Sequence, residues 1–153
     1  MWVFRISTPL HAADAFSGEG ARLYGGRWNP KGWPLVYAAA TRSLALLEML
    51  AQDQPLHARY SFIPAELTDR LEMERFTSAQ LPRDWRKAAA RTRLRQLGRE
   101  WMERGRTAVL AVPSAVLPQE ENFLLNPRHA DFGRIRIGRV EPLDTDSRLL
   151  RFQ

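Results

Sequence analysis

The sequence predicts an α+β fold, a single compact domain over residues 1–153 in which small mixed sheets pack with helices. Three observations lead to this prediction. Short runs with strand character recur along the chain, two longer segments have helical periodicity, and the two kinds do not alternate in the regular order of a doubly wound sheet. The length fits one domain with a substantial core, and no internal repeat or linker-like tract divides it.

The first half of the chain predicts two strands and a helix around a long irregular segment. Residues 2–6 form an apolar, β-branched run, and residues 7–34 hold five of the nine glycines, as expected of an ordered loop with a function. Residues 35–39 predict a short strand. Thr41 is placed to cap a helix over residues 42–52, so this strand should lead directly into a helix.

The second half predicts one amphipathic helix among three strands. Residues 59–64 alternate like a half-buried strand, and residues 81–104 repeat apolar side chains at helical spacing before Gly105, which favours a helix end. The continuous apolar run at 107–113 indicates a central strand. Residues 134–140 alternate strictly, which predicts a strand with one solvated face.

Composition excludes several kinds of site. The chain has no cysteine, so it forms no disulfide and no thiolate metal site, and its three histidines, His11, His57 and His129, are scattered. We therefore expect no bound metal and no Ser-His-Asp triad. No run approaches the roughly 18 apolar residues of a membrane span, and the start of the chain lacks an export signal, so a cytoplasmic protein is expected.

The charge balance makes polyanions plausible partners. The formal net charge is +6, and all but Lys31 and Lys87 of the 23 basic residues are arginines, which bind phosphate groups through paired hydrogen bonds. Eight basic residues fall in or beside the segment 81–104. They are Arg83, Arg86, Lys87, Arg91, Arg93, Arg95, Arg99 and Arg104. This face suits a nucleic-acid-binding or RNA-cleaving module, but a solvated face or a docking surface for an acidic partner is favoured, because no aromatics are interleaved on it.

Glu48 is the first candidate for chemistry. The helix over 42–52 is apolar almost all round, which predicts a buried helix, and Glu48 is its only charged residue after Arg42. A buried carboxylate must be paired or hydrogen-bonded to remain ionised. A buried Glu–Arg pair and a catalytic role are equally compatible with this helix alone.

Arg27 and Tyr37 are the next candidates. Arg27 follows two glycines in Gly25-Gly26-Arg27-Trp28-Asn29, a sequence that suits an anion cradle but matches neither dinucleotide-binding nor P-loop glycine patterns. The alternative is a tight turn anchored by a buried Trp28. Tyr37 faces away from Val36 on its strand and can present its ring or hydroxyl to a cleft, although a core tyrosine is the more frequent case.

These pieces together resemble one known family. In chain order, the segments are Gly18-Glu19-Gly20-Ala21, Gly25-Gly26-Arg27-Trp28-Asn29, Tyr37, Leu44-Ala45-Leu46-Leu47-Glu48, Val112-Pro113-Ser114 and Asn122-Phe123-Leu124-Leu125-Asn126-Pro127-Arg128-His129. Together, and in this order, they resemble the RES-domain family of bacterial toxins over most of the chain. The resemblance implies a fold related to ADP-ribosyltransferases and a toxin of a type II toxin–antitoxin system. Its implied activity is depletion of NAD⁺ by hydrolysis or phosphorolysis, and some relatives instead modify proteins with ADP-ribose.

Carried over by position, the resemblance implies a site and a mechanism. Arg27, Tyr37 and Glu48 become the catalytic residues. The implied substrate contacts are Arg27, Tyr37, Asn29, Ser114 and Asn122, with Ser114 as a supporting hydrogen-bond donor. Departure of nicotinamide leaves positive charge on the ribose, which the Glu48 carboxylate would stabilise. Arg27 would then hold the diphosphate or an attacking phosphate. NAD⁺ is the expected substrate, inorganic phosphate a possible co-substrate, and no cofactor is expected.

The resemblance also implies a partner. This is a cognate antitoxin with a helix-turn-helix DNA-binding portion, whose other end covers the active site. DNA would be contacted only through that complex, no membrane is involved, and a homodimer is left open. Phe16, Leu23, Tyr24 and Trp33 suggest an apolar rim for docking, which core packing explains equally well.

Overall fold

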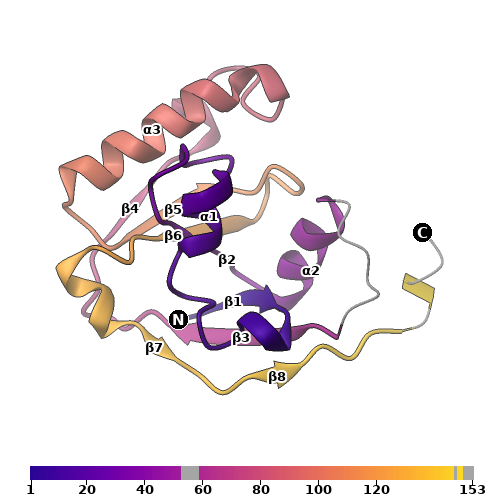
Figure 1. The fold of residues 1–153 in the computed structure, drawn as a ribbon. Coiled ribbons are helices and arrows are strands. Elements are labelled where there is room, and N and C mark those ends of the chain that lie inside the picture. The colour runs from indigo at the N-terminus through magenta and orange to yellow at the C-terminus, as the bar shows by residue number, and fades with distance from the viewer. Residues whose placement is uncertain (53–58, 147, 150–153) are drawn as a thin grey trace.

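The described residues of this computed structural model, 1–52, 59–146 and 148–149, form one curved sheet with helices against it (Figure 1). The strands are β1 (Trp2–Ser7), β2 (Val36–Ala39), β3 (Ser61–Glu66), β4 (Met73–Arg75), β5 (Val109–Pro113), β6 (Glu121–Leu125), β7 (Arg136–Ile137) and β8 (Glu141–Pro142). Their order in space is β4-β5-β6-β2-β1-β3-β7, and β8 also pairs with β3. The predicted α+β class is confirmed, but the expected small sheets join into one eight-stranded sheet.

Three α-helices and four short 3₁₀ turns complete the described fold. They are α1 (Glu19–Tyr24), α2 (Arg42–Leu50), α3 (Arg91–Arg104), η1 (Pro9–His11), η2 (Ser78–Gln80), η3 (Ala88–Ala90) and η4 (Ala130–Arg134). In this part of the chain no helix is long and apolar enough to cross a bilayer.

All five residues of β5 are buried, but this strand lies next to the edge strand β4 and not, as its apolar run predicted, at the centre of the sheet. Val109 and Ala111 pack into one apolar cluster and Leu110 and Val112 into the other, so both faces of this strand are covered. Such two-sided burial explains the continuous apolar run. β5 runs antiparallel to β6 and parallel to β4.

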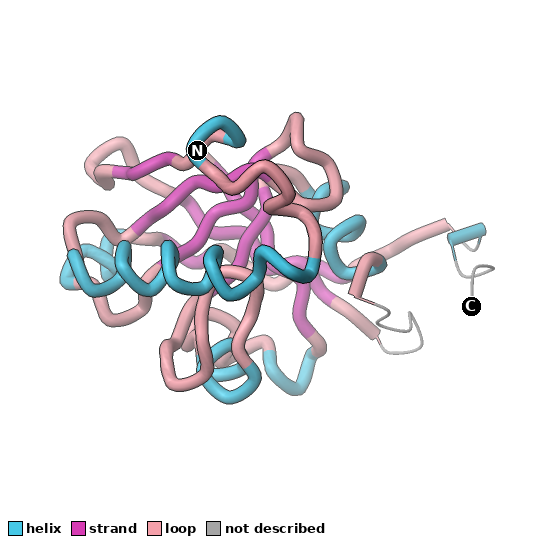
Figure 2. Tube along the Cα trace, turned by 90° about the horizontal axis from the view of Figure 1, so that it is seen from above, coloured by secondary structure: helices cyan, strands magenta, loops and turns pink. Residues whose placement is uncertain are grey.

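α3 covers one face of the sheet, where Leu94 and Trp101 are fully buried. Figure 2 shows this long helix lying across the strands. Trp28, from the glycine-rich segment, belongs to the same cluster. The glycine-rich segment is therefore part of the packing on the α3 face.

Several predicted elements differ from the structure in extent. The predicted helix over 81–104 begins only at Arg91, because the residues before it form turns and η3. The predicted strand over 134–140 shrinks to β7, whose two residues are exposed, and only Ile135 beside it is buried. This segment lies at the edge of the sheet. Its alternating apolar and polar residues therefore do not correspond to a half-buried strand.

One α-helix and three strands have no counterpart in the sequence prediction, and the two-residue β8 is one of these strands. α1 is a six-residue helix within the glycine-rich segment, β4 is a three-residue strand, and β6 runs from polar to apolar residues without alternation. Short length and missing periodicity hide such elements from pattern analysis.

Candidate active site

Glu48 is brought to the sheet by the turn that joins β2 to α2. The Thr41 hydroxyl accepts a hydrogen bond from the Leu44 amide at 3.0 Å, which starts the helix as its sequence predicted. The Glu48 carboxylate then reaches the end of β5 and the start of β6. Its Oε1 accepts hydrogen bonds from Ser114 Oγ at 2.6 Å and from Asn122 Nδ2 at 2.5 Å.

The surroundings of Glu48 correct two expectations. α2 is not buried all round: Leu44, Ala45 and Met49 are buried, but Leu47 is 41% exposed and Glu48 is half-buried. Glu48 also makes no ion pair within the described residues, so the alternative of a buried Glu–Arg pair is wrong. One carboxylate oxygen is held by two neutral donors, and the other accepts no hydrogen bond from these parts of the chain.

Ser114 lies behind Glu48. Its side chain is 0% exposed, and its hydroxyl donates to Glu48 while accepting from the amides of Val116 and Leu117, both at 3.1 Å. The donor and both lone pairs of this hydroxyl are thereby used. Ser114 does not line the pocket described below, so the structure gives the expected substrate contact a different position, one that supports Glu48.

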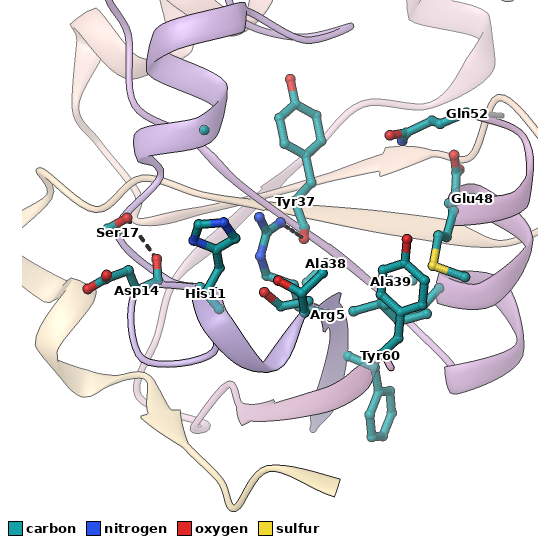
Figure 3. A pocket seen from close by; sticks show the side chains of 18 of the residues that line it. Arg5, His11, Asp14, Ser17, Tyr37, Ala38, Ala39, Glu48, Gln52 and Tyr60 are labelled. Carbon is teal, nitrogen blue, oxygen red and sulfur yellow. Dashed lines mark hydrogen bonds between the residues drawn. The ribbon is translucent and has the colours of Figure 1, made fainter. Parts of the chain in front are cut away.

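Glu48 opens onto a pocket of about 630 Å³ between α2, β1 and β2, a size typical of small-molecule sites (Figure 3). Tyr37, Glu48 and Asn122 all line it, whereas Arg27 and Asn29 do not. In the view of Figure 3, Glu48 and Gln52 lie on one side of Tyr37, with Arg5 and His11 on the other. The pocket therefore places a carboxylate and a guanidinium around one aromatic ring.

Tyr37 contributes its ring to the pocket and its hydroxyl to the glycine-rich segment. The hydroxyl donates to Asn29 Oδ1 at 2.6 Å and accepts from the Trp28 amide at 3.0 Å. Burial raises the pKa of Tyr37 above its ordinary value. The side chain is thus a neutral phenol whose only donor is already used.

Asn29 organises the turn that follows Arg27 and is 0% exposed. Its amide nitrogen lies within 3.2 Å of three backbone carbonyl oxygens, those of Ala21, Pro30 and Trp33. With its oxygen bound to Tyr37, Asn29 has no group left for a substrate. Asn29 is thus a buried support of the turn in this structure, and it does not line the pocket.

The paired glycines serve packing. A side chain at Gly26 would collide with the Tyr37 hydroxyl, and Gly25 has a positive φ of 71°. The amides of Gly25 and Gly26 donate to Ala21 and Asn29 carbonyls, so they are not free to bind an anion. Buried Trp28 anchors this turn, as the alternative interpretation expected.

Arg27 lies outside the pocket lining but within the electrostatic field of Glu48. Burial lowers the pKa of Arg27, and the charge of Arg91 lowers it further, while Glu48 raises it. Its Nη1 makes two long hydrogen bonds, to the carbonyl of Trp85 at 3.4 Å and that of Arg86 at 3.3 Å. Most of its donors are unused by the described residues.

Arg5, on β1, is a pocket residue that the sequence analysis missed. Its Nη1 donates to the Tyr37 carbonyl at 2.9 Å, its Nε is buried without a partner, and burial lowers its pKa. No carboxylate pairs with it in the described chain. The available signal was strand parity, because Arg5 shares a strand face with Val3, which is fully buried.

The histidines form no cluster. No group of three metal-ligating side chains occurs among the residues with described positions. His129 caps η4 by accepting from the Asp131 amide, and its other ring nitrogen lies 3.0 Å from the Gly105 carbonyl oxygen. His11 lines the pocket, and His57 falls outside the described residues.

Fold and site together define a class: a small α+β protein with a carboxylate and a guanidinium in one small-molecule pocket. Residues 3–146 match the family model of the RES domain. The chain belongs to the RES-domain family, as the sequence motifs indicated.

Characterised relatives align over nearly their whole length. The protein named Toxin Res from Photorhabdus laumondii subsp. laumondii is 36% identical over 155 residues, covering 99% of this chain and 98% of that protein. Toxin Res from Yersinia enterocolitica is 37% identical over 145 residues, covering 94% of each. The Prs ADP-ribosylating toxin of Sphingobium sp. is 36% identical over 156 residues, covering 98% and 96%.

A solved structure shares the fold. The crystal structure of the M. tuberculosis MbcT-MbcA toxin–antitoxin complex superposes with a TM-score of 0.78 at 22% identity. The match covers 98% of this chain and 86% of that one. At this identity the likeness extends to the fold.

Proposed function

We propose that this protein is the toxin of a type II toxin–antitoxin system and cleaves the nicotinamide–ribose bond of NAD⁺. The observation that carries the proposal is the Glu48 carboxylate, which borders a small-molecule pocket with one oxygen held by Ser114 and Asn122. The names of relatives at 36–37% identity, Toxin Res among them, support the toxin assignment.

The reaction requires stabilisation of developing positive charge. When the bond between the ribose C1″ and the nicotinamide nitrogen breaks, its electron pair leaves with nicotinamide and the ribose gains oxocarbenium character. A carboxylate whose position is already fixed stabilises that charge without reorganising in the transition state. In this proposal the free oxygen of Glu48 faces the ribose, and its other oxygen stays bound to Ser114 and Asn122.

The remaining pocket residues receive complementary roles. The Tyr37 ring provides a flat surface for the nicotinamide or its ribose, because its hydroxyl is occupied elsewhere. Arg5 and Arg27 both lack a carboxylate within ion-pair distance among the described residues. Both guanidinium groups are suited to the substrate's diphosphate.

The acceptor can be water, phosphate or a protein side chain, since each supplies an oxygen or nitrogen that bonds to C1″ and loses a proton. Hydrolysis or phosphorolysis is the principal proposal. Transfer of ADP-ribose to a protein is the second candidate, which the name of the Sphingobium relative, Prs ADP-ribosylating toxin, favours.

A cognate antitoxin is the proposed partner, with DNA contacted only through the complex and the protein acting in the cytoplasm. The likeness to a toxin solved with its antitoxin supports this. Of the four residues suggested as an apolar rim, Phe16 is core and Trp33 half-buried, but Leu23 and Tyr24 are exposed and line the pocket. These two exposed side chains are suited to an antitoxin segment that closes the pocket.

Consumption of NAD⁺ by the purified protein tests the proposal. Wild type should consume NAD⁺ and release nicotinamide, and Glu48→Gln should abolish turnover because it keeps the shape and removes the charge. Glu72→Gln, at an exposed position, is the matched control and should retain wild-type activity. NMR of the products with and without phosphate identifies the acceptor. Unchanged turnover in Glu48→Gln contradicts the mechanism, and no turnover by any folded, antitoxin-free protein directs the search to a protein acceptor.

A further inference from the structure

Four arginines surround the start of α3 and the glycine-rich turn, and we call them the arginine cluster. They are Arg27, Arg86, Arg91 and Arg95. None of them forms an ion pair in the described parts of the chain. They are close enough to act on one another electrostatically: Arg91 and Arg86 lower the pKa of Arg27, and the charges of Arg95 and Arg27 both act on Tyr37. The cluster is a region of uncompensated positive charge.

The other arginines of α3 differ in this respect. Each has a glutamate partner at 2.7–3.5 Å, and these pairs are Arg93–Glu100, Arg99–Glu103 and Arg104–Glu74. Paired and unpaired arginines therefore occur on the same helix. The unpaired ones gather on the side of α3 that meets the turn bearing Arg27, where Arg95 bonds to the Gly26 carbonyl.

Backbone carbonyls hold three of the four guanidinium groups in place. Arg86 Nε donates to the Ala115 carbonyl at 2.8 Å, Arg95 Nε donates to the Gly26 carbonyl at 2.8 Å, and Arg27 reaches two carbonyls through Nη1. A guanidinium has five N–H donors, so each of these three groups keeps several donors that no described residue uses. These guanidinium groups are therefore held in place and still have donors available for a ligand, as at sites that bind phosphate.

The beginning of α3 adds to the local positive potential. Arg91 is the first residue of this 14-residue helix, its first turn contains no acidic residue, and Ala90 provides no side-chain cap. The helix dipole disfavours cations at this end and favours anions. Arg91 therefore occupies an unfavourable position unless an anion binds there.

We propose that the arginine cluster is a binding site for a phosphate group. Two sources have this chemistry, free inorganic phosphate and the diphosphate of a nucleotide substrate. The choice between them rests on the proposed function. None of the four arginines lines the pocket, but Glu48, which does, acts electrostatically on Arg27. The binding of phosphate itself does not depend on NAD⁺ cleavage.

Inorganic phosphate is the probe in the first experiment. Its dissociation constant is measured by calorimetry in chloride buffer of low ionic strength for wild type, for Arg86→Gln/Arg91→Gln, and for the control Arg93→Gln/Arg99→Gln. Both double variants remove two charges from the same region. The cluster variant should bind phosphate about tenfold more weakly or worse, since charge-assisted hydrogen bonds are lost, and the control should stay within about twofold of wild type. Equal weakening in both variants, or no binding by wild type, overturns the site.

Steady-state turnover then distinguishes the two sources. If free phosphate binds at the cluster, Arg86→Gln/Arg91→Gln raises the phosphate concentration needed for half-maximal turnover and leaves the KM for NAD⁺ unchanged. If the cluster holds the substrate's diphosphate, the KM for NAD⁺ rises and phosphate competes with NAD⁺. Weaker phosphate binding without either change overturns the link to the pocket. If wild type consumes no NAD⁺, the proposed function fails, and the calorimetry still decides the site.

Discussion

At the scale of single residues, the two oxygens of Glu48 have different tasks. Oε1 is held by Ser114 and Asn122, and Oε2 is left for a ligand. Ser114 is itself fixed by two backbone amides, so the orientation of the carboxylate derives from the turn after β5. Ser114 therefore acts as a positioning residue. Its removal should lower the rate of the reaction without changing the binding of the substrate.

The variant Ser114→Ala should lower kcat for NAD⁺ consumption by about tenfold, because one of the two hydrogen bonds that orient Glu48 is lost. KM should change little, since Ser114 does not line the pocket. The amides of Val116 and Leu117 also lose their acceptor, so the free energy of unfolding should fall by about 1–3 kcal/mol. Steady-state kinetics and urea unfolding measure both, with the exposed Ser43→Ala on α2 as control. A raised KM with unchanged kcat would indicate direct substrate contact instead.

Tyr37 makes stability depend on pH in the alkaline range. Burial holds the pKa of its hydroxyl above the value of about 10 expected in the unfolded chain. Above pH of about 10 the unfolded chain therefore loses this proton while the folded protein keeps it. The free energy of unfolding should then fall as pH rises, by up to about 1.4 kcal/mol per pH unit from this group.

Removing the hydroxyl in Tyr37→Phe should eliminate the contribution of this group to the pH dependence of the free energy of unfolding. At neutral pH the variant should be less stable than wild type by about 1–3 kcal/mol, because Trp28 and Asn29 lose a partner. Between pH of about 8 and 10.5 its stability should decline less than that of wild type. Urea unfolding at both pH values tests this, and Tyr24→Phe, at a 77% exposed side chain, should decline like wild type. Equal declines in wild type and Tyr37→Phe would show that the buried hydroxyl does not contribute.

At the scale of elements, the β2–α2 unit was predictable and the contact between α3 and the glycine-rich turn was not. The apolar run at 35–39 and the capping Thr41 are local signals, and the structure follows both. The position of α3 depends on tertiary packing, because Gly98, in the middle of this helix, meets the backbone of Trp28 from a turn about 70 residues earlier in the chain. From the sequence alone, a glycine at this position is expected only to destabilise the helix.

Two effects oppose each other in Gly98→Ala. Alanine favours the helix by about 1 kcal/mol. However, a methyl group at this position would collide with the Trp28 carbonyl oxygen, which belongs to the backbone and cannot rotate away. Steric overlap should prevail and lower the free energy of unfolding by about 1–3 kcal/mol. Gly20→Ala, in α1 with open space around it, is the control and should be neutral or stabilising. A stabilised Gly98→Ala would mean that the turn and α3 separate easily.

At the scale of the whole molecule, the candidate site could be predicted only in part. The motifs pointed to Glu48 and Tyr37, which line the pocket, and to Arg27, which lies outside its lining. They did not reveal that Asn29 is a buried support, that Ser114 donates to Glu48 or that Arg5 lines the pocket. Those roles depend on pairing between distant strands, such as Ala39 with Asn122, which no local pattern encodes.

Because the pocket draws on β1, β2, α2 and β6, a bound ligand should stabilise the whole fold. Glu48→Gln allows this to be measured, since it should bind NAD⁺ without consuming it. At about one hundred times the dissociation constant, binding adds about 2.7 kcal/mol, which for a protein of this size raises Tm by about 5–10 °C. Adding Arg5→Gln should reduce this shift, because the pocket loses a guanidinium that pairs with no carboxylate among the described residues. Adding the exposed Arg70→Gln should leave the shift unchanged. Differential scanning calorimetry with and without NAD⁺ gives the answer. A shift that persists in full without Arg5 would place the nucleotide outside the pocket, and no shift in Glu48→Gln would remove NAD⁺ as its ligand.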